Sequence, residues 1–169
     1  MNEFIIIANG PDRTGIVSNL SKIITDNSGN IKKSKMTTLA GDFVIIMLLE
    51  TKLSKSTLES SLTSLNLNVT IKNATPKDTK SQQTLLKMIY LSGTDNEGLV
   101  YSLTDSLSKH RINIHNLTTK IVQAPITGIN LFSMEAKIEI PKDVSLKLIT
   151  KEINFLKDDL GVDIKLKDI

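Results

Sequence analysis

The sequence predicts an α+β protein that consists of two βαββαβ units in tandem, and three observations carry this prediction. Residues 10–31 recur in altered form at residues 93–114, half a chain length later. Both copies follow a short apolar run and open with a glycine-containing turn. Beyond the turn, apolar residues fall first at helical spacing and then alternate, as strand residues do. A self-match over this distance indicates one structural unit used twice.

Seven positions are identical in the two copies, and the best-matched part is a Gly-x-Asp-x-x-Gly turn that leads into a helix. The identical pairs are Gly10/Gly93, Asp12/Asp95, Gly15/Gly98, Val17/Val100, Leu20/Leu103, Asn30/Asn113 and Ile31/Ile114. Turns of this kind place backbone N–H groups against something small and anionic. We expect two domains, residues 1–74 and 85–169, and a polar linker that contains proline at residues 75–84.

The first three elements of the first unit follow from local patterns. Residues 4–8 form a continuous apolar run, which is typical of a strand buried on both faces. Within residues 16–24 the apolar side chains fall on one helical face, and Gly29 is expected to end that helix. Residues 30–39 then predict the second strand.

The rest of the first unit completes the order. Residues 42–50 predict a strand that joins the preceding one through a tight hairpin at Ala40-Gly41. A capping box at residues 56–59, together with a stripe of leucines, predicts the second helix. Alternation over residues 67–71 predicts the closing strand.

The second unit repeats this order. We expect strands at residues 85–91, from Ile112 onward, at 132–140 and at 162–166, and helices at 99–107 and 149–160. A βαββαβ unit forms a four-stranded antiparallel sheet with both helices on one face, the ferredoxin-like arrangement. The other face of each sheet is then open, and we expect the partner unit or another chain to cover it.

Composition excludes several function classes. The chain has no cysteine, which excludes disulfides, thiolate zinc sites and cysteine nucleophiles. The first residues lack a basic region and carry only a short apolar run, so we expect a cytoplasmic protein without signal peptide or membrane span. The net charge is +3 and only Arg13 and Arg111 are arginines, whereas sequence-reading DNA contacts depend heavily on arginine. The basic cluster at residues 32–35 favours a solvated strand face over a phosphate-binding patch.

The turn between the first strand and the first helix is the candidate site, and two interpretations stay open. In the structural one, Asp12 and Asp95 are helix N-caps and the glycines serve only the turn. In the functional one, backbone N–H groups and the helix dipole hold a carboxylate, while Asp12 and Asn30 accept hydrogen bonds from an ammonium. Asn30 begins the neighbouring strand, so we expect its amide near the turn. Together these groups are complementary to a free amino acid.

At these residues the chain resembles the ACT domain family of small-molecule-binding regulatory modules. The matching parts are the strand–turn–helix at residues 4–24, the dipeptides Asn30-Ile31 and Asn113-Ile114, and the βαββαβ order. The tandem layout, with SMEAKIEIP and FLKDDLGVDIKL late in the chain, looks most like the glycine cleavage system transcriptional repressor group. The resemblance covers essentially the whole chain.

The resemblance implies one ligand turn in each unit. The first consists of Gly10, Pro11, Asp12, Arg13, Thr14 and Gly15, with Asn30 as its strand partner. The second consists of Gly93, Thr94, Asp95, Asn96, Glu97 and Gly98, with Asn113. Glu97 repels a carboxylate, which makes the first site the stronger candidate. Alternatively, Glu97 is an ordinary acidic residue at the start of the helix, where its charge interacts favourably with the helix dipole.

Three rival interpretations are weaker. RNA-recognition modules need stacking aromatics on the first and third strands, and the third strand of the first unit offers only Phe43. Acylphosphatase-like enzymes need an arginine in the first turn, where Arg13 lies, but the surrounding motif is missing. His110 and His115 have no third ligand at a convincing spacing, which favours a surface or packing role over metal binding.

We therefore expect a non-enzymatic regulator, without cofactor or metal, that senses an amino acid or a similar small metabolite. The finer expectation is a role in the transcription of glycine cleavage genes, exerted through a partner. The alternative is a ligand-independent interaction module that uses the sheet or its edge. We expect a homo-oligomer or a protein partner, and neither direct nucleic-acid binding nor membrane binding.

Overall fold

The computed structural model describes residues 1–75, 84–124 and 127–169. The chain divides into two compact units, residues 1–78 and 79–169. Nearly all of the predicted linker at residues 75–84 lies outside the described residues, so its boundaries stay a prediction.

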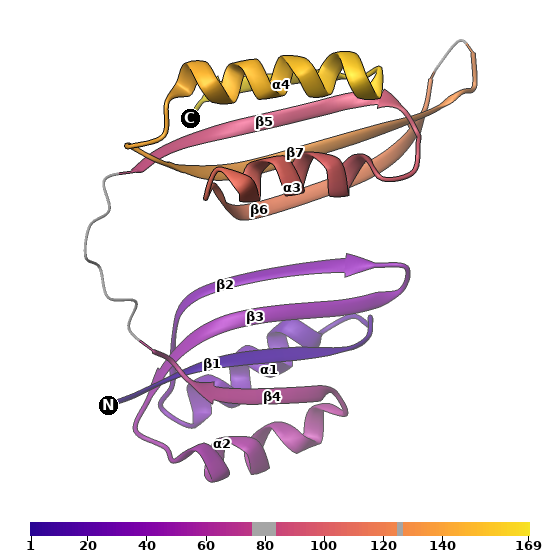
Figure 1. Ribbon diagram of the computed structural model, residues 1–169. Coiled ribbons are helices and arrows are strands. Elements are labelled where there is room, and N and C mark those ends of the chain that lie inside the picture. The colour runs from indigo at the N-terminus through magenta and orange to yellow at the C-terminus, as the bar shows by residue number, and fades with distance from the viewer. Residues whose placement is uncertain (76–83, 125–126) are drawn as a thin grey trace. The chain divides into compact units, whose positions relative to one another are not determined.

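Both units have the predicted βαββαβ order (Figure 1). The first contains β1 (Asn2–Pro11), α1 (Ile16–Asp26), β2 (Asn30–Leu39), β3 (Asp42–Thr51), α2 (Lys55–Leu62), the 3₁₀ turn η1 (Thr63–Leu65) and β4 (Asn68–Asn73). The second contains β5 (Thr84–Thr94), α3 (Leu99–Lys109), β6 (Asn113–Gln123), β7 (Asn130–Pro141), α4 (Leu146–Leu160) and β8 (Asp163–Asp168).

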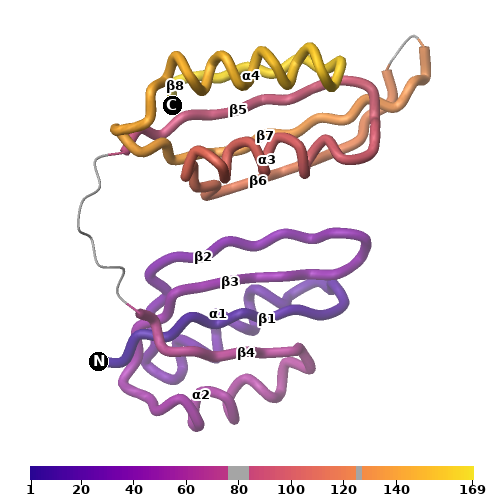
Figure 2. The backbone as a smooth tube through the Cα atoms, viewed as in Figure 1, coloured from indigo at the N-terminus to yellow at the C-terminus, as the bar shows by residue number. Residues whose placement is uncertain are grey.

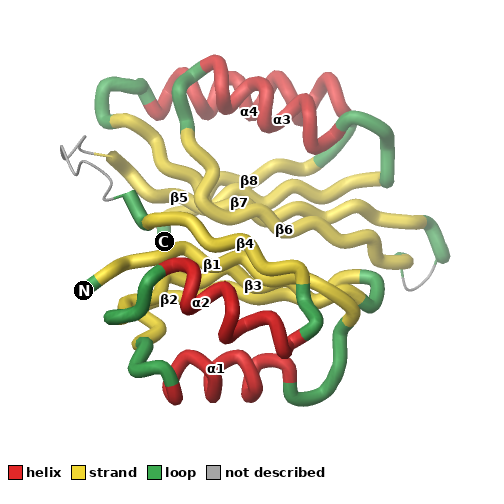
Figure 3. The backbone as a smooth tube through the Cα atoms, turned by 90° about the horizontal axis from the view of Figure 1, so that it is seen from below, coloured by secondary structure: helices red, strands yellow, loops and turns green. Residues whose placement is uncertain are grey.

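Each unit is a two-layer α+β domain, which confirms the predicted fold class. The sheet orders are β2-β3-β1-β4 and β6-β7-β5-β8, and all neighbouring strands are antiparallel. In each unit, both helices lie on one face of the unit's own sheet (Figure 3). The crossover through α1 leaves room between β1 and β2, and β3 occupies that place.

Each unit has a hydrophobic core of its own, between its sheet and its helices. Along β1 every second side chain enters this core, namely Phe4, Ile6 and Ala8, because strand side chains alternate between faces. From α1 the buried residues are Ile16, Leu20 and Ile24, the stripe expected of an amphipathic helix. Residues buried in one cluster do not appear in the other.

The hairpin between β2 and β3 confirms the prediction at Ala40-Gly41. Ala40 has φ +51° and Gly41 has φ +87°. Two consecutive residues with positive φ are what a two-residue hairpin turn of type I′ requires.

Two predicted helix ends are wrong in detail. At the end of α1 the residue in the left-handed conformation is Ser28, with φ +55°, and not Gly29. Glycine is required at position 29 because a side chain there would collide with its neighbours. A Cβ on Gly29 would lie 2.8 Å from Cγ2 of Ile24 and 3.1 Å from Cδ1 of Leu49. The cap of α2 is Ser54 and not Ser56, since the Ser54 side chain accepts the Thr57 N–H at 3.2 Å.

Candidate functional site

The turn from β1 to α1 is exposed from Pro11 to Gly15, and the β2–β3 hairpin holds its backbone in place. The N–H of Asp12 donates to the carbonyl of Gly41 at 2.8 Å. The hydroxyl of Thr38, near the end of β2, lies 3.5 Å from Oδ2 of Asp12. The Asp12 carboxylate is therefore at the surface, beside the edge strand.

Helix α1 begins at Ile16 without a side-chain cap. Its N-cap is Gly15, in the left-handed conformation with φ +90°. The N–H of Asn19 donates to the Gly15 carbonyl at 2.9 Å, so the N–H groups of Val17 and Ser18, which precede it in the first turn, have no acceptor within the helix. This exposed end has the donors and the dipole that favour an anion.

The prediction that Asp12 and Asp95 are N-caps is wrong. Gly15 and Gly98 are the N-caps of α1 and α3, and neither helix has a side-chain cap. The chain reaches each helix through a left-handed glycine, which puts the aspartate three residues before the cap. Asp12 instead ties the turn to the hairpin through its backbone.

The second turn repeats this backbone geometry. Gly98 has φ +83°, and the N–H of Ser102 donates to its carbonyl at 2.9 Å. The N–H of Asp95 donates to the carbonyl of Asn130 at 3.2 Å, as Asp12 does to Gly41. Glu97 is exposed immediately before the helix, so it places a negative charge where an anion would bind.

Gly10 and Gly93 serve close packing inside the units. A Cβ on Gly10 would lie 2.9 Å from Cδ2 of Leu67, and a Cβ on Gly93 would lie 2.6 Å from Cγ1 of Val162. The space beside each glycine is filled by the residue that immediately precedes the last strand of its unit. The structural interpretation therefore accounts for both residues.

Arg13 is engaged with its own unit. One guanidinium nitrogen donates to the carbonyl of Leu65, at the end of η1. This bond fixes the turn to the segment that precedes β4. At the corresponding place the second unit has Asn96.

The prediction that Asn30 and Asn113 lie near the turns is wrong within each unit. Asn30 pairs with Glu50 on β3, whereas Gly10 pairs with Phe43, seven residues away along the same strand. At about 3.4 Å per residue the two ends are separated by about 24 Å. Figure 2 shows β2 starting at the end of the sheet opposite to the β1–α1 turn. Asn113 and Gly93 are separated in the same way, through Glu139 and Phe132.

The physical reason is the direction of the crossover. Helix α1 runs back along the sheet, so β2 begins at the end where β1 begins and not where β1 finishes. The turn is held instead by contacts with Thr38, Gly41 and Leu65, which no pattern in the sequence indicated. Two of these contacts use backbone carbonyls, which carry no signal in residue type.

Near the second turn, at the start of β8, the carboxylate of Asp163 forms ion pairs with two lysines. Hydrogen bonds from Lys165 and then from Lys157 hold the pKa of Asp163 below its usual value. The Nζ–Oδ distances are 2.8 Å for Lys165 and 3.2 Å for Lys157.

In the part of the chain that the structure describes, no three His, Asp or Glu side chains come together as a metal site would need. None of the helices in the same ranges is long and apolar enough to cross a bilayer.

Comparison with known proteins identifies relatives of the fold. The model of the ACT domain family matches residues 2–72. A solved structure of an unknown protein from Galdieria sulphuraria is 29% identical and superposes with a TM-score of 0.89 over 99% of this chain and 98% of its own. A candidate glycine cleavage system transcriptional repressor is 21% identical and superposes with a TM-score of 0.67 over 98% and 96%. No curated protein matches the sequence.

Proposed function

Because the model of the ACT domain family matches residues 2–72 and the second unit repeats their fold, we propose that this protein is a cytoplasmic, non-enzymatic regulator that senses an amino acid or a similar small metabolite. Its ligand site is the first turn, Gly10–Gly15, together with the N-terminus of α1. The likeness in fold to a candidate glycine cleavage system transcriptional repressor supports a role in amino-acid metabolism.

The observation that carries this proposal is the exposed, uncapped N-terminus of α1 in the same turn as the exposed Asp12. The ligand carboxylate accepts hydrogen bonds from the N–H groups of Val17 and Ser18, where the helix dipole favours negative charge. The ligand ammonium meets the carboxylate of Asp12, which lies beside Thr38 at the surface. Asn30 has no part in this site within one unit, because it lies at the far end of the sheet.

The second turn, with Asp95, Asn96, Glu97 and Gly98, is the weaker site of the same kind. Its helix end has the same geometry as the first. Glu97 stands where the first unit has Thr14, so a bound carboxylate meets a like charge there.

Calorimetry of the full chain with each proteinogenic amino acid tests the site. We expect Val17→Pro to weaken binding at least about tenfold, because it removes one backbone donor to a charged acceptor, a bond of about 1.5–3 kcal/mol. Proline is tolerated in the first helical turn, where the N–H has no helical partner. Asp12→Asn is expected to weaken binding as well, since it removes the charge that meets the ammonium.

Val100→Pro is the matched control in the second unit and is expected to change affinity little. Thermal unfolding of each variant checks that the fold is kept. Equal affinity in Val17→Pro, Asp12→Asn and the unchanged protein would show that the first turn is structural only. No binding of any amino acid by the unchanged protein would exclude them as its ligands.

A role in transcription, on this proposal, goes through a DNA-binding partner. We expect no sequence-selective DNA binding by the isolated chain, because the described residues hold no helix-turn-helix pair, and the chain has only Arg13 and Arg111 as arginines. RNA stacking on β3 is also disfavoured, since Phe43 is 1% exposed. Fluorescence anisotropy with labelled duplexes at about 0.15 M salt checks this, and nanomolar selective binding would contradict it.

The second candidate function is a ligand-independent interaction module, and the sheet edges favour it. Strands β2 and β6 are 10 and 11 residues long, lie at the outer edges of their sheets, and are exposed over most of their length. An edge strand can pair through its backbone with another strand, including one from a second copy of the chain. A partner that binds equally well with and without amino acid would support this function over sensing.

A further inference from the structure

The face of the first sheet that its helices leave open carries a group of five aliphatic side chains, here named the aliphatic floor, with lysines on both sides of it. On β1 and β3, alternate side chains enter the core, so the side chains between them line the open face: Ile5, Ile7, Val44, Ile46 and Leu48. On β2, Lys33 lies opposite Leu48 and Lys35 lies opposite Ile46. On β4, Lys72 lies opposite Ile5.

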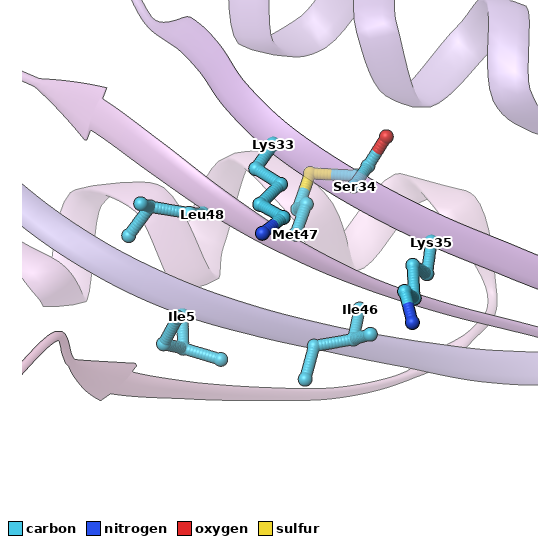
Figure 4. A pocket seen from close by; sticks show the side chains of 7 residues that line it. All are labelled: Ile5, Lys33, Ser34, Lys35, Ile46, Met47 and Leu48. Carbon is cyan, nitrogen blue, oxygen red and sulfur yellow. The ribbon is translucent and has the colours of Figure 1, made fainter. Parts of the chain in front are cut away.

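Part of this face is hollowed. A depression of about 200 Å³ is lined by Ile5, Ile46 and Leu48, with Lys33 and Lys35 beside them. Figure 4 shows both lysine side chains reaching from β2 across the face that the three aliphatic residues line. The depression lies over the middle of β1 and β3, because Leu48 pairs with Ile5 and Ile46 pairs with Ile7, three residues before Gly10.

The second sheet provides an internal comparison. Gly10 pairs with Phe43 and Gly93 pairs with Phe132, which aligns β3 with β7 residue by residue. In β7 the places of Val44, Ile46 and Leu48 are taken by Ser133, Glu135 and Lys137. In β6 the places of Lys33 and Lys35 are taken by Asn116 and Thr118. On the second face the β7 residues are thus polar and the two β6 residues are uncharged, while β5 contributes Met88 and Tyr90 in the places of Ile5 and Ile7.

The size of the floor favours a small ligand over a protein. It covers two strands about 5 Å apart and about 13 Å of their length, on the order of 100 Å². A stable protein interface buries about 800 Å² on each partner. The aliphatic floor is too small to anchor such an interface, but it matches an alkyl chain of medium length.

We propose that this open face binds a small amphiphilic carboxylate. The alkyl chain lies on Ile5, Ile46 and Leu48, where burial of each methylene favours binding. The carboxylate lies between the ammonium groups of Lys33 and Lys35, since the charges are complementary. This site goes beyond the amino-acid site and shares no residue with it, because it lies on the open face over the middle of the sheet, whereas the Gly10–Gly15 turn lies at the end of β1.

Calorimetry of the full chain with octanoate, below its micelle concentration, tests the chemistry. We expect octanoate to bind and to bind at least about tenfold more tightly than butyrate, because four methylenes are added and each is worth up to about fourfold when fully buried. Octylammonium, with the same chain and the opposite charge, is expected to show no binding at the same concentrations. Equal binding of octylammonium and octanoate, or no binding of octanoate, would overturn the proposal.

Variants test whether octanoate binds on this face of the first sheet. Lys33→Gln/Lys35→Gln is expected to weaken octanoate binding about fivefold, as two exposed ion pairs are lost. Ile46→Glu, which installs the residue of the second sheet, is expected to weaken it further. Lys165→Gln/Lys167→Gln on the second sheet is the matched control and should leave it unchanged. An affinity unaffected by Lys33→Gln/Lys35→Gln overturns the proposal.

One further measurement distinguishes this site from the amino-acid site, and a second distinguishes the small ligand from a protein partner. Val17→Pro is expected to leave octanoate binding unchanged, so failure of the amino-acid site and failure of this one are distinguishable. Binding of a helical peptide of leucine and glutamate, without binding of octanoate, would assign the face to an acidic protein partner and overturn the proposal. Far-ultraviolet circular dichroism checks the fold of every variant.

Discussion

Leu103→Ala is expected to lower the free energy of unfolding of the second unit by about 3 kcal/mol, and Leu20→Ala to do the same in the first. Leu103 is 1% exposed and Leu20 is 0% exposed, each at the centre of the helix face that meets its own sheet. Removing a buried leucine side chain loses its transfer free energy and leaves a cavity, with a typical cost of about 2–5 kcal/mol. In a domain of this size that lowers Tm by more than about 10 °C.

The chain carries a natural fluorescent probe in the second unit alone. Both tyrosines, Tyr90 and Tyr101, belong to the second unit, and the chain has no tryptophan. Tyrosine fluorescence therefore follows the unfolding of the second unit, while far-ultraviolet circular dichroism follows both. Leu103→Ala should shift the fluorescence transition. Leu20→Ala should shift only a transition seen by circular dichroism, because the two cores share no buried residue.

Positions outside the two cores supply the control for this pair, namely exposed Ser18 and half-buried Ser106. Ser18→Ala on α1 and Ser106→Ala on α3 lie on the same helices and should change stability by less than about 0.5 kcal/mol. Equal shifts of the fluorescence transition in Leu20→Ala and Leu103→Ala would contradict the expectation that each core stabilises its own unit.

Gly93→Ala is expected to destabilise the second unit by about 2–3 kcal/mol, whereas Gly10→Ala should cost the first unit less than about 1 kcal/mol. The new methyl at position 93 meets Cγ1 of Val162 at 2.6 Å and its Cα at 3.2 Å, so a short branched side chain and the backbone must both move. At position 10 it meets Cδ2 of Leu67 at 2.9 Å, the far end of a flexible side chain, while the Leu67 Cα is 3.9 Å away.

Urea unfolding, followed by tyrosine fluorescence for Gly93→Ala and by circular dichroism for Gly10→Ala, measures the two costs. Adding Val162→Ala to Gly93→Ala removes the shortest contact and should restore part of the lost stability. Equal costs at both glycines would show that the nature of the neighbouring side chain does not decide the effect.

Local patterns in the sequence were sufficient to predict the elements and their order. The helices follow from apolar spacing on one face, as for Ile16, Leu20 and Ile24, and the strands follow from alternation. The hairpin at Ala40-Gly41 follows from Gly41, since glycine adopts the positive φ of such a turn without strain. These features depend on neighbours within a few residues, so the sequence shows them directly. Because the sequence repeats, the order of elements predicted for the first unit also applied to the second.

The composition of the candidate site depended on contacts that no local pattern describes. The sequence placed Asn30 beside the turn because it follows α1, and the strand order puts it about 24 Å away instead, at about 3.4 Å for each residue of β3. Asp12 and Asp95 have the residue type of an N-cap, but Gly15 and Gly98 occupy the cap. Arg13 reaches the Leu65 carbonyl, a bond between residues far apart in the chain.

By itself, the sequence determined that this protein is two βαββαβ units with a glycine turn before the first helix of each. The tertiary structure decided which residues surround those turns, and it placed the aliphatic floor and the lysines on one open face of the first sheet only. The reason is physical: helix and strand propensities act over a few residues, whereas strand order and register arise from packing of the whole unit, and they decide which distant side chains meet.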